Sequence, residues 1–233
     1  MKTSSLLILG GIAMSTLIGC QAEKSESKCC AKTETTQKAP YKKKYTNADF
    51  YKDGKLQADV ALAAYLDMFE YYGIPYTDFL KKNMFISDFE LGDFENVGMA
   101  GVFFINDADN GYFGHDIFLL PEQMIVEHKH LKTAHAAKME SWQIRNGWCY
   151  NFGTGEPTPG APTHPASQNG FITVANFSKL NEGDIATLNE REAPHFLRAG
   201  DNGAIVTEYG TFHDNDGLTF TNPKVNFVDI LQK

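Results

Sequence analysis

Cysteine is scarce in this chain of 233 residues, which holds four of them, at positions 20, 29, 30 and 149. Two of the four are adjacent, and Cys29 and Cys30 are poorly placed to bond to each other because disulfide geometry is restrictive. Acylation, pairing with another chain and no role at all stay open for this pair. So few thiols, without regular spacing, exclude a disulfide framework.

A long hydrophobic run is also missing, because the apolar stretch near the start is shorter than the about 20 residues that span a membrane. Lys2 precedes Leu6–Met14, and Leu17-Ile-Gly-Cys20 follows. This pattern is typical of an export signal. The last four residues resemble a bacterial lipobox, in which the cysteine is acylated; an ordinary signal peptide with a chance cysteine is the alternative. We expect a signal peptide over 1–19 and an exported protein, lipid-anchored through Cys20 on the periplasmic or cell-surface side of a membrane.

Positive charge is low beyond residue 45. Residues 20–45 are rich in Lys, Glu, Ser and Thr and nearly free of large apolar side chains, which predicts a flexible tether. From residue 46 onward there are 13 basic and 26 acidic residues. Such an acidic body excludes nucleic acid as a partner and favours a neutral substrate or a cation. Its length suits one domain, over 46–233.

The texture of this domain changes near Met84. Before it, residues 46 to about 83 show a helical pattern that stops at Gly73 and Pro75. After it, short runs rich in Val, Ile, Phe and Tyr alternate with Gly, Asp, Asn and Pro, as in Gly101–Ile105. The pattern predicts an all-β sandwich or barrel with a helical N-terminal extension.

His128-x-His130 is the sharpest local motif. Residues two apart in a strand point to the same side, so both imidazoles can face one metal ion. Nine residues separate His130 from Glu140, far enough for a turn and a return strand, and Lys138 shares the face of Glu140. Two histidines at this spacing also occur by chance, and the weight of the motif depends on its surroundings. Later in the chain, Pro194-His195 would bring a fourth ligand from a separate hairpin.

These positions resemble a known arrangement. The two motifs of the cupin superfamily supply two His and one Glu, then one His, and the matching residues here are His128, His130, Glu140, Gly183-Asp184 and Pro194-His195. The first motif is longer than in a common cupin. That gap, with Lys138 and Glu140 before Arg145-Asn-Gly147, is similar to the D-lyxose isomerase branch of sugar-isomerase cupins, as is the tail over 208–223. The resemblance covers roughly residues 84–225.

The resemblance implies a cupin jelly-roll β-barrel that holds one divalent metal ion on His128, His130, Glu140 and His195. Mixed nitrogen and oxygen ligands suit Mn, Zn, Fe, Co or Ni, and the family analogy favours manganese. It also implies a metal-dependent aldose–ketose isomerase that acts through an enediol on a pentose or hexose such as D-lyxose or D-mannose.

Isomerisation needs a base beside the carbon that loses its proton. Glu208 lies on the strand after the His195 hairpin, and we expect it to shuttle the proton. Lys138 is expected to act as its electrostatic or acid partner. The alternative for each is a charge on the surface.

Two other functions stay open for the same ligand set. One is an iron dioxygenase, which usually has an apolar pocket, and the other is a non-catalytic, surface-anchored carbohydrate- or metal-binding module. Glu208 and Lys138 favour the isomerase, whereas the export signal supports the binding module. Exposed sheet edges also favour a homodimer.

Other side chains are less informative. His135 is a rival ligand in the stretched motif, and His213 belongs to a polar turn or to the pocket mouth. We expect Trp142 in the core, and His115 and His164 as ordinary strand or loop residues.

Overall fold

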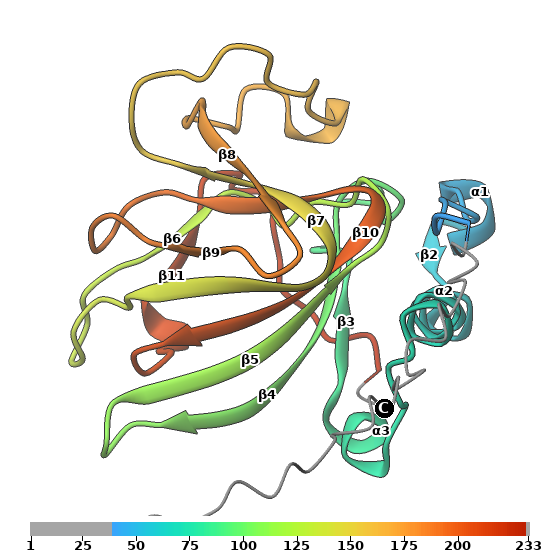
Figure 1. Ribbon diagram of the computed structural model, residues 1–233, viewed down its shortest axis with the longest axis horizontal. Helices are drawn as coiled ribbons and strands as arrows, with labels where there is room; N and C mark the ends of the chain where they lie inside the picture. Colours follow the sequence, from blue (N-terminus) through green and yellow to red (C-terminus); the bar gives the residue numbers. More distant parts are fainter. Residues whose placement is uncertain (1–38, 232–233) are drawn as a thin grey trace, which may run out of the picture. The chain divides into compact units, whose positions relative to one another are not determined.

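The computed structural model describes residues 39–231. Three predicted features lie outside this range: the signal peptide over 1–19, the lipid anchor on Cys20, and the part of the tether up to residue 38. Three α-helices lie in the N-terminal part of the described residues (Figure 1): α1 (Asn47–Phe50), α2 (Ala58–Tyr72) and α3 (Asp78–Asn83). Among the described residues, none of the helices has the length and apolar character needed to cross a membrane.

Local chemistry sets the ends of these helices. Gly73 ends α2 in the left-handed conformation, with φ of 72°, which glycine adopts without a steric penalty. Thr77 caps α3, because its hydroxyl accepts a hydrogen bond from the Leu80 amide at 3.3 Å. Packing of the chain begins before α1: Tyr41 is buried, and its hydroxyl donates to the Ala64 carbonyl at 3.4 Å.

Antiparallel strands form the rest of the domain. A seven-stranded sheet has the order β3-β4-β5-β10-β7-β8, with β9 also paired to β7. Two smaller sheets pair β1 with β2 and β6 with β11. The strands are β1 (Tyr51–Lys52), β2 (Lys55–Leu56), β3 (Phe85–Ser87), β4 (Met99–Asp107), β5 (Tyr112–Leu119), β6 (His128–His130), β7 (Glu140–Gly153), β8 (Asn176–Asn181), β9 (Ile185–Thr187), β10 (Phe196–Gly210) and β11 (Leu218–Phe220).

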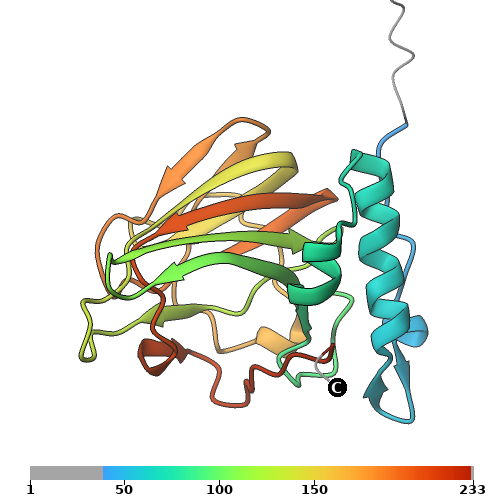
Figure 2. The ribbon, with the colours of Figure 1, turned by 90° about the horizontal axis from the view of Figure 1, so that it is seen from below.

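The main sheet separates two hydrophobic cores, because successive side chains of a strand point to opposite faces. On one face Ala100, Phe118 and Ile205 pack against α2, which stands beside the sheet (Figure 2). On the other face Ile117 and Val206 belong to the second core. Each large apolar side chain buried in these layers contributes about 1.5–3 kcal/mol to the stability of the folded state.

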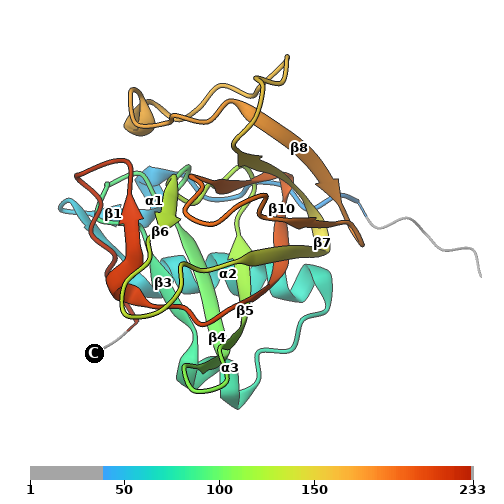
Figure 3. The same cartoon turned by 90° about the vertical axis from the view of Figure 1, so that its left-hand side faces the viewer.

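The small sheet of β6 and β11 completes the second core. These two strands pair on the side of the molecule opposite the helices (Figure 1), which is the side that faces the viewer in Figure 3. Residue His128 also forms an isolated bridge with His195. A mostly β fold with N-terminal helices is therefore confirmed. The strand ladders of the described chain leave the main sheet open, so the hydrogen bonds do not close it into the barrel that the jelly-roll prediction implied.

Candidate metal centre and active site

Three imidazoles gather where β6 meets the start of β10. His128 and His195 exchange two backbone hydrogen bonds, at 3.1 and 2.9 Å, which places their side chains next to each other. Their ring centroids are 4.4 Å apart, and the His130 ring is 5.8 Å from that of His195. One ligand atom from each of the three residues lies within 4.8 Å of the others. A single cation can therefore contact all three.

Backbone carbonyls orient two of these rings. Nδ1 of His128 lies 2.9 Å from the Val126 carbonyl, and Nδ1 of His195 lies 2.8 Å from the Ala193 carbonyl. A carbonyl only accepts, so each Nδ1 carries the proton and each Nε2 presents a lone pair. Metal-binding histidines are commonly fixed in this way by the ring nitrogen that does not bind the metal.

Glu140 brings a carboxylate to the imidazoles. Its Oε2 is 2.9 Å from Nε2 of His195, and its Oε1 is 3.2 Å from Nε2 of His130. Oε2 and both Nε2 atoms are buried, yet none has a hydrogen-bond partner. Buried polar atoms are normally satisfied, and three such atoms converging on one region suit shared coordination of a divalent ion. The four predicted ligands thus lie together and fit a metal.

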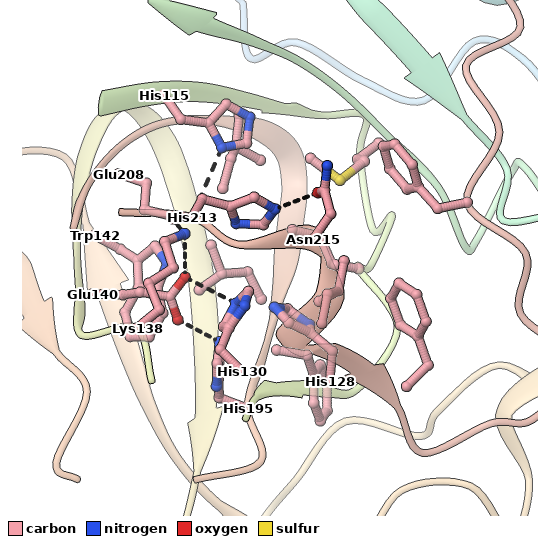
Figure 4. Close-up of a pocket in the computed structure, with 18 of the residues that line it drawn as sticks. His115, His128, His130, Lys138, Glu140, Trp142, His195, Glu208, His213 and Asn215 are labelled. Atoms are coloured by element: carbon pink, nitrogen blue, oxygen red, sulfur yellow. Dashed lines mark hydrogen bonds and ion pairs between the residues drawn. The ribbon is translucent and has the colours of Figure 1, made fainter. Parts of the chain in front are cut away.

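Lys138 links this group to Glu208. Its ammonium donates to Oε1 of Glu140 at 2.7 Å and to Oε1 of Glu208, so it bridges the two carboxylates (Figure 4). All three side chains are buried. The two residues predicted as catalytic therefore lie beside the predicted ligands, and neither is on the surface.

The environment shifts the pKa values of the two carboxyl groups in opposite directions. Burial opposes ionisation of Glu140, but Lys138 and the adjacent imidazoles outweigh it and hold its pKa well below the usual value. Burial raises the pKa of Glu208 to about 7 even though Lys138 acts in the opposite direction. An ionised Glu140 suits a metal ligand, and a Glu208 that titrates near neutrality suits proton transfer.

These groups line one cavity of about 450 Å³. Three residues that sequence reasoning did not assign to the site also line it, although the pocket mouth was one of the two positions expected for His213. His115 lies with Nδ1 3.9 Å from Oε2 of Glu208, His213 approaches His130 with ring centroids 5.3 Å apart, and Trp142 lies 5.2 Å from the His195 ring. His115 is therefore not an ordinary strand residue. Its alternation with Phe113 and Ile117 along the strand was the available signal that it points inward.

His135 and His164 are absent from this cavity. His135 is exposed, and its ring lies tilted against that of Phe212, with centroids 4.7 Å apart. Its ring is thus placed in a surface loop and not among the candidate ligands.

Comparison with known proteins places the chain among sugar isomerases. It is 31% identical over 150 residues to a D-lyxose/D-mannose isomerase of Thermosediminibacter oceani, which covers 64% of this chain and 81% of the relative. It is 29% identical over 163 residues to a D-lyxose ketol-isomerase of a Thermofilum species, covering 69% of this chain and 89% of the relative. No family model matches the chain.

Solved structures agree on the fold. The L-ribose isomerase of Acinetobacter sp. DL28, solved in complex with L-ribose, superposes with a TM-score of 0.57 at 14% identity, over 72% of this chain and 92% of that chain. The fold and the relatives define a mostly β sugar isomerase. The chain belongs to the D-lyxose/D-mannose isomerase family, as its identity to the Thermosediminibacter enzyme and its coverage of that enzyme show.

Proposed function

We propose that the chain is a metal-dependent aldose–ketose isomerase acting on a pentose or hexose such as D-lyxose or D-mannose. The observation that carries the proposal is the position of Lys138, whose ammonium joins Glu208 to Glu140 beside three converging imidazoles. The cavity thus combines a proton-transfer residue with a candidate cation site. The names of the relatives supply the substrate class.

In this proposal His128, His130, Glu140 and His195 hold one divalent ion, with manganese favoured over zinc, iron, cobalt or nickel. A bound ion would stabilise the negative charge that develops on the substrate oxygens at C1 and C2. The remaining steps belong to side chains of the chain itself.

Glu208 removes the proton from C2 of the open-chain aldose. The electrons of that C–H bond form the C1=C2 bond, and the π electrons of the C1=O1 bond move onto O1, which gives an enediolate. Glu208 then returns the proton to C1, while the O2 proton moves to O1 and leaves a carbonyl at C2. A carboxyl group with a pKa of about 7 can take and return a proton near neutral pH. The ammonium of Lys138 holds Glu208 in place and offsets the negative charge of the Glu208 carboxylate.

A screen of pentoses and hexoses for ketose formation, with added Mn²⁺, tests this proposal. We expect turnover with D-lyxose or D-mannose, and a loss of roughly a hundredfold or more in Glu208→Gln, as general acid–base groups contribute about 10²–10⁴-fold. Glu190→Gln is the matched control, because Glu190 is exposed and does not line the cavity. Wild-type protein that converts none of these sugars would refute the isomerase.

We further propose that Cys20 carries the lipid that holds the exported domain at the periplasmic or cell-surface side of a membrane. Support comes from the lipobox-like Leu17-Ile-Gly-Cys20. Labelling of bacteria that express the chain with a palmitate analogue tests it: Cys20→Ala should lose the label and release the domain, whereas Cys29→Ala should keep the anchor. Retention of label and membrane association in Cys20→Ala would overturn this assignment.

A further inference from the structure

His213 lines the cavity from the segment that follows β10. Its ring stacks on Phe113 with centroids 5.5 Å apart and lies 5.7 Å from the Phe103 ring. It is also next to His130, one of the candidate ligands, at 5.3 Å. Figure 4 shows the ring between Glu208 and Asn215, above His130. The ring is thus held against an apolar wall, next to the reacting groups.

A hydrogen bond fixes the orientation of this ring. Nε2 lies 3.0 Å from Oδ1 of Asn215, an amide oxygen that can only accept, so Nε2 carries the proton. Nδ1 of the neutral ring then presents a lone pair. That atom is buried and has no hydrogen-bond partner. An unsatisfied acceptor in a ligand cavity is a place for a donor from the ligand.

Apart from the candidate metal ligands, His115 carries the other unsatisfied ring nitrogen among the described residues that line the cavity, and this nitrogen cannot play the same part. Nε2 of His115 also lacks a partner, but it faces the backbone of β4. A methyl group built on Gly101 would collide with it, and the backbone oxygen of Asp116 is 2.9 Å from the same position. The space beside this nitrogen is therefore too small for a substrate hydroxyl.

We propose that His213 is a specificity-determining residue whose Nδ1 accepts a hydrogen bond from the C3 or C4 hydroxyl of the aldose. The inference rests on the proposed function and adds a contact to it. The candidate ligands, Lys138 and Glu208 take the atoms at C1 and C2, and His213 lies immediately beyond His130 and Lys138. In this proposal the carbon chain passes the His213 ring as it leaves the reacting end. A hydroxyl there gains an acceptor, whereas a deoxy analogue leaves Nδ1 unpaired.

The test compares D-mannose with 3-deoxy- and 4-deoxy-D-mannose, using the full chain loaded with Mn²⁺. Wild type should favour D-mannose over one of the two analogues by about tenfold or more in kcat/KM, because a site that bonds a hydroxyl rejects the analogue without it. In His213→Phe, which keeps an aromatic ring on Phe113, that preference should fall to about twofold or less. His213→Gln restores an acceptor and should recover part of it.

His135→Phe is the matched control, since it makes the same chemical change at an exposed histidine outside the cavity and should leave the preference unchanged. A purely structural role for His213 would lower the rates on all three sugars alike and keep their ratio, and that result would overturn the inference. If no aldose is isomerised, the proposed function fails. Calorimetric binding of the three sugars then decides the inference separately, with equal discrimination by wild type and His213→Phe counting against it.

Discussion

Replacing Lys138 with Met removes the positive charge between two buried carboxylates. Glu140 is 2% exposed and Glu208 5% exposed, and Nζ of Lys138 donates to both. Removing one partner of a buried ion pair costs about 3–5 kcal/mol, because the charge left behind is uncompensated. We expect metal-free Lys138→Met to lose about that much free energy of unfolding at pH 8, measured by urea denaturation in the presence of a chelator.

The loss should depend on pH. Burial raises the pKa of Glu208 to about 7 in the folded protein, above its value in the unfolded chain. Between these two values the folded state binds more protons, so this group lowers stability as the pH rises. Lys138 acts against that rise, and its removal raises the pKa of Glu208 further. The variant should therefore differ from wild type less at pH 5, where Glu208 is protonated in both folded proteins.

Lys81→Met is the control for the loss of a lysine ion pair. Nζ of Lys81 is 2.8 Å from Asp78, but the two side chains are 55% and 98% exposed. An exposed pair contributes little, so the free energy of unfolding should hardly change. Equal losses in the two variants, or a larger loss for Lys138→Met at pH 5 than at pH 8, would refute the reasoning.

Two further changes address the frame around the site. Glu127→Gln should lower the free energy of unfolding by about 1–3 kcal/mol in urea titrations, because the buried carboxylate accepts from the amide and hydroxyl of Thr173, both at 2.7 Å, and from the hydroxyl of Thr221 at 2.6 Å. An unchanged unfolding midpoint would contradict it. Gly101→Ala should lower kcat/KM roughly tenfold or more, because the new methyl group collides with His115 and moves the ring away from Glu208. Wild-type kinetics in this variant would show that the position of His115 is unimportant.

Most of the candidate metal ligands can be predicted from the local sequence pattern. Period-two alternation is sufficient to place His128 and His130 on one side of a strand, and a turn with a return strand is sufficient to bring Glu140 back toward them. His128 and His195, which are joined by a bridge, are 67 positions apart in the chain. Motif resemblance predicted that contact, because local periodicity carries no information on which distant strands pair.

The other cavity residues depend on register. His115 is opposite Glu208 because β5 pairs with β10 in one particular alignment. A shift of one residue would turn His115 to the other face. His213 comes from an irregular segment, where alternation gives no direction. The same limit applies to the predicted barrel: strand-rich texture indicates a β fold, but closure depends on edge pairing, and the described edges β3 and β8 do not pair with each other.

Metal content of the purified domain tests the central claim most directly. Elemental analysis after incubation with Mn²⁺ and removal of the unbound ion should give one metal per wild-type chain. His195→Ala should lose it, because Glu140 and His128 then lack the ring that lies between them, whereas His135→Ala should keep it. Wild-type chain without stoichiometric metal, or a His195→Ala variant that binds metal as tightly as wild type, would contradict the account.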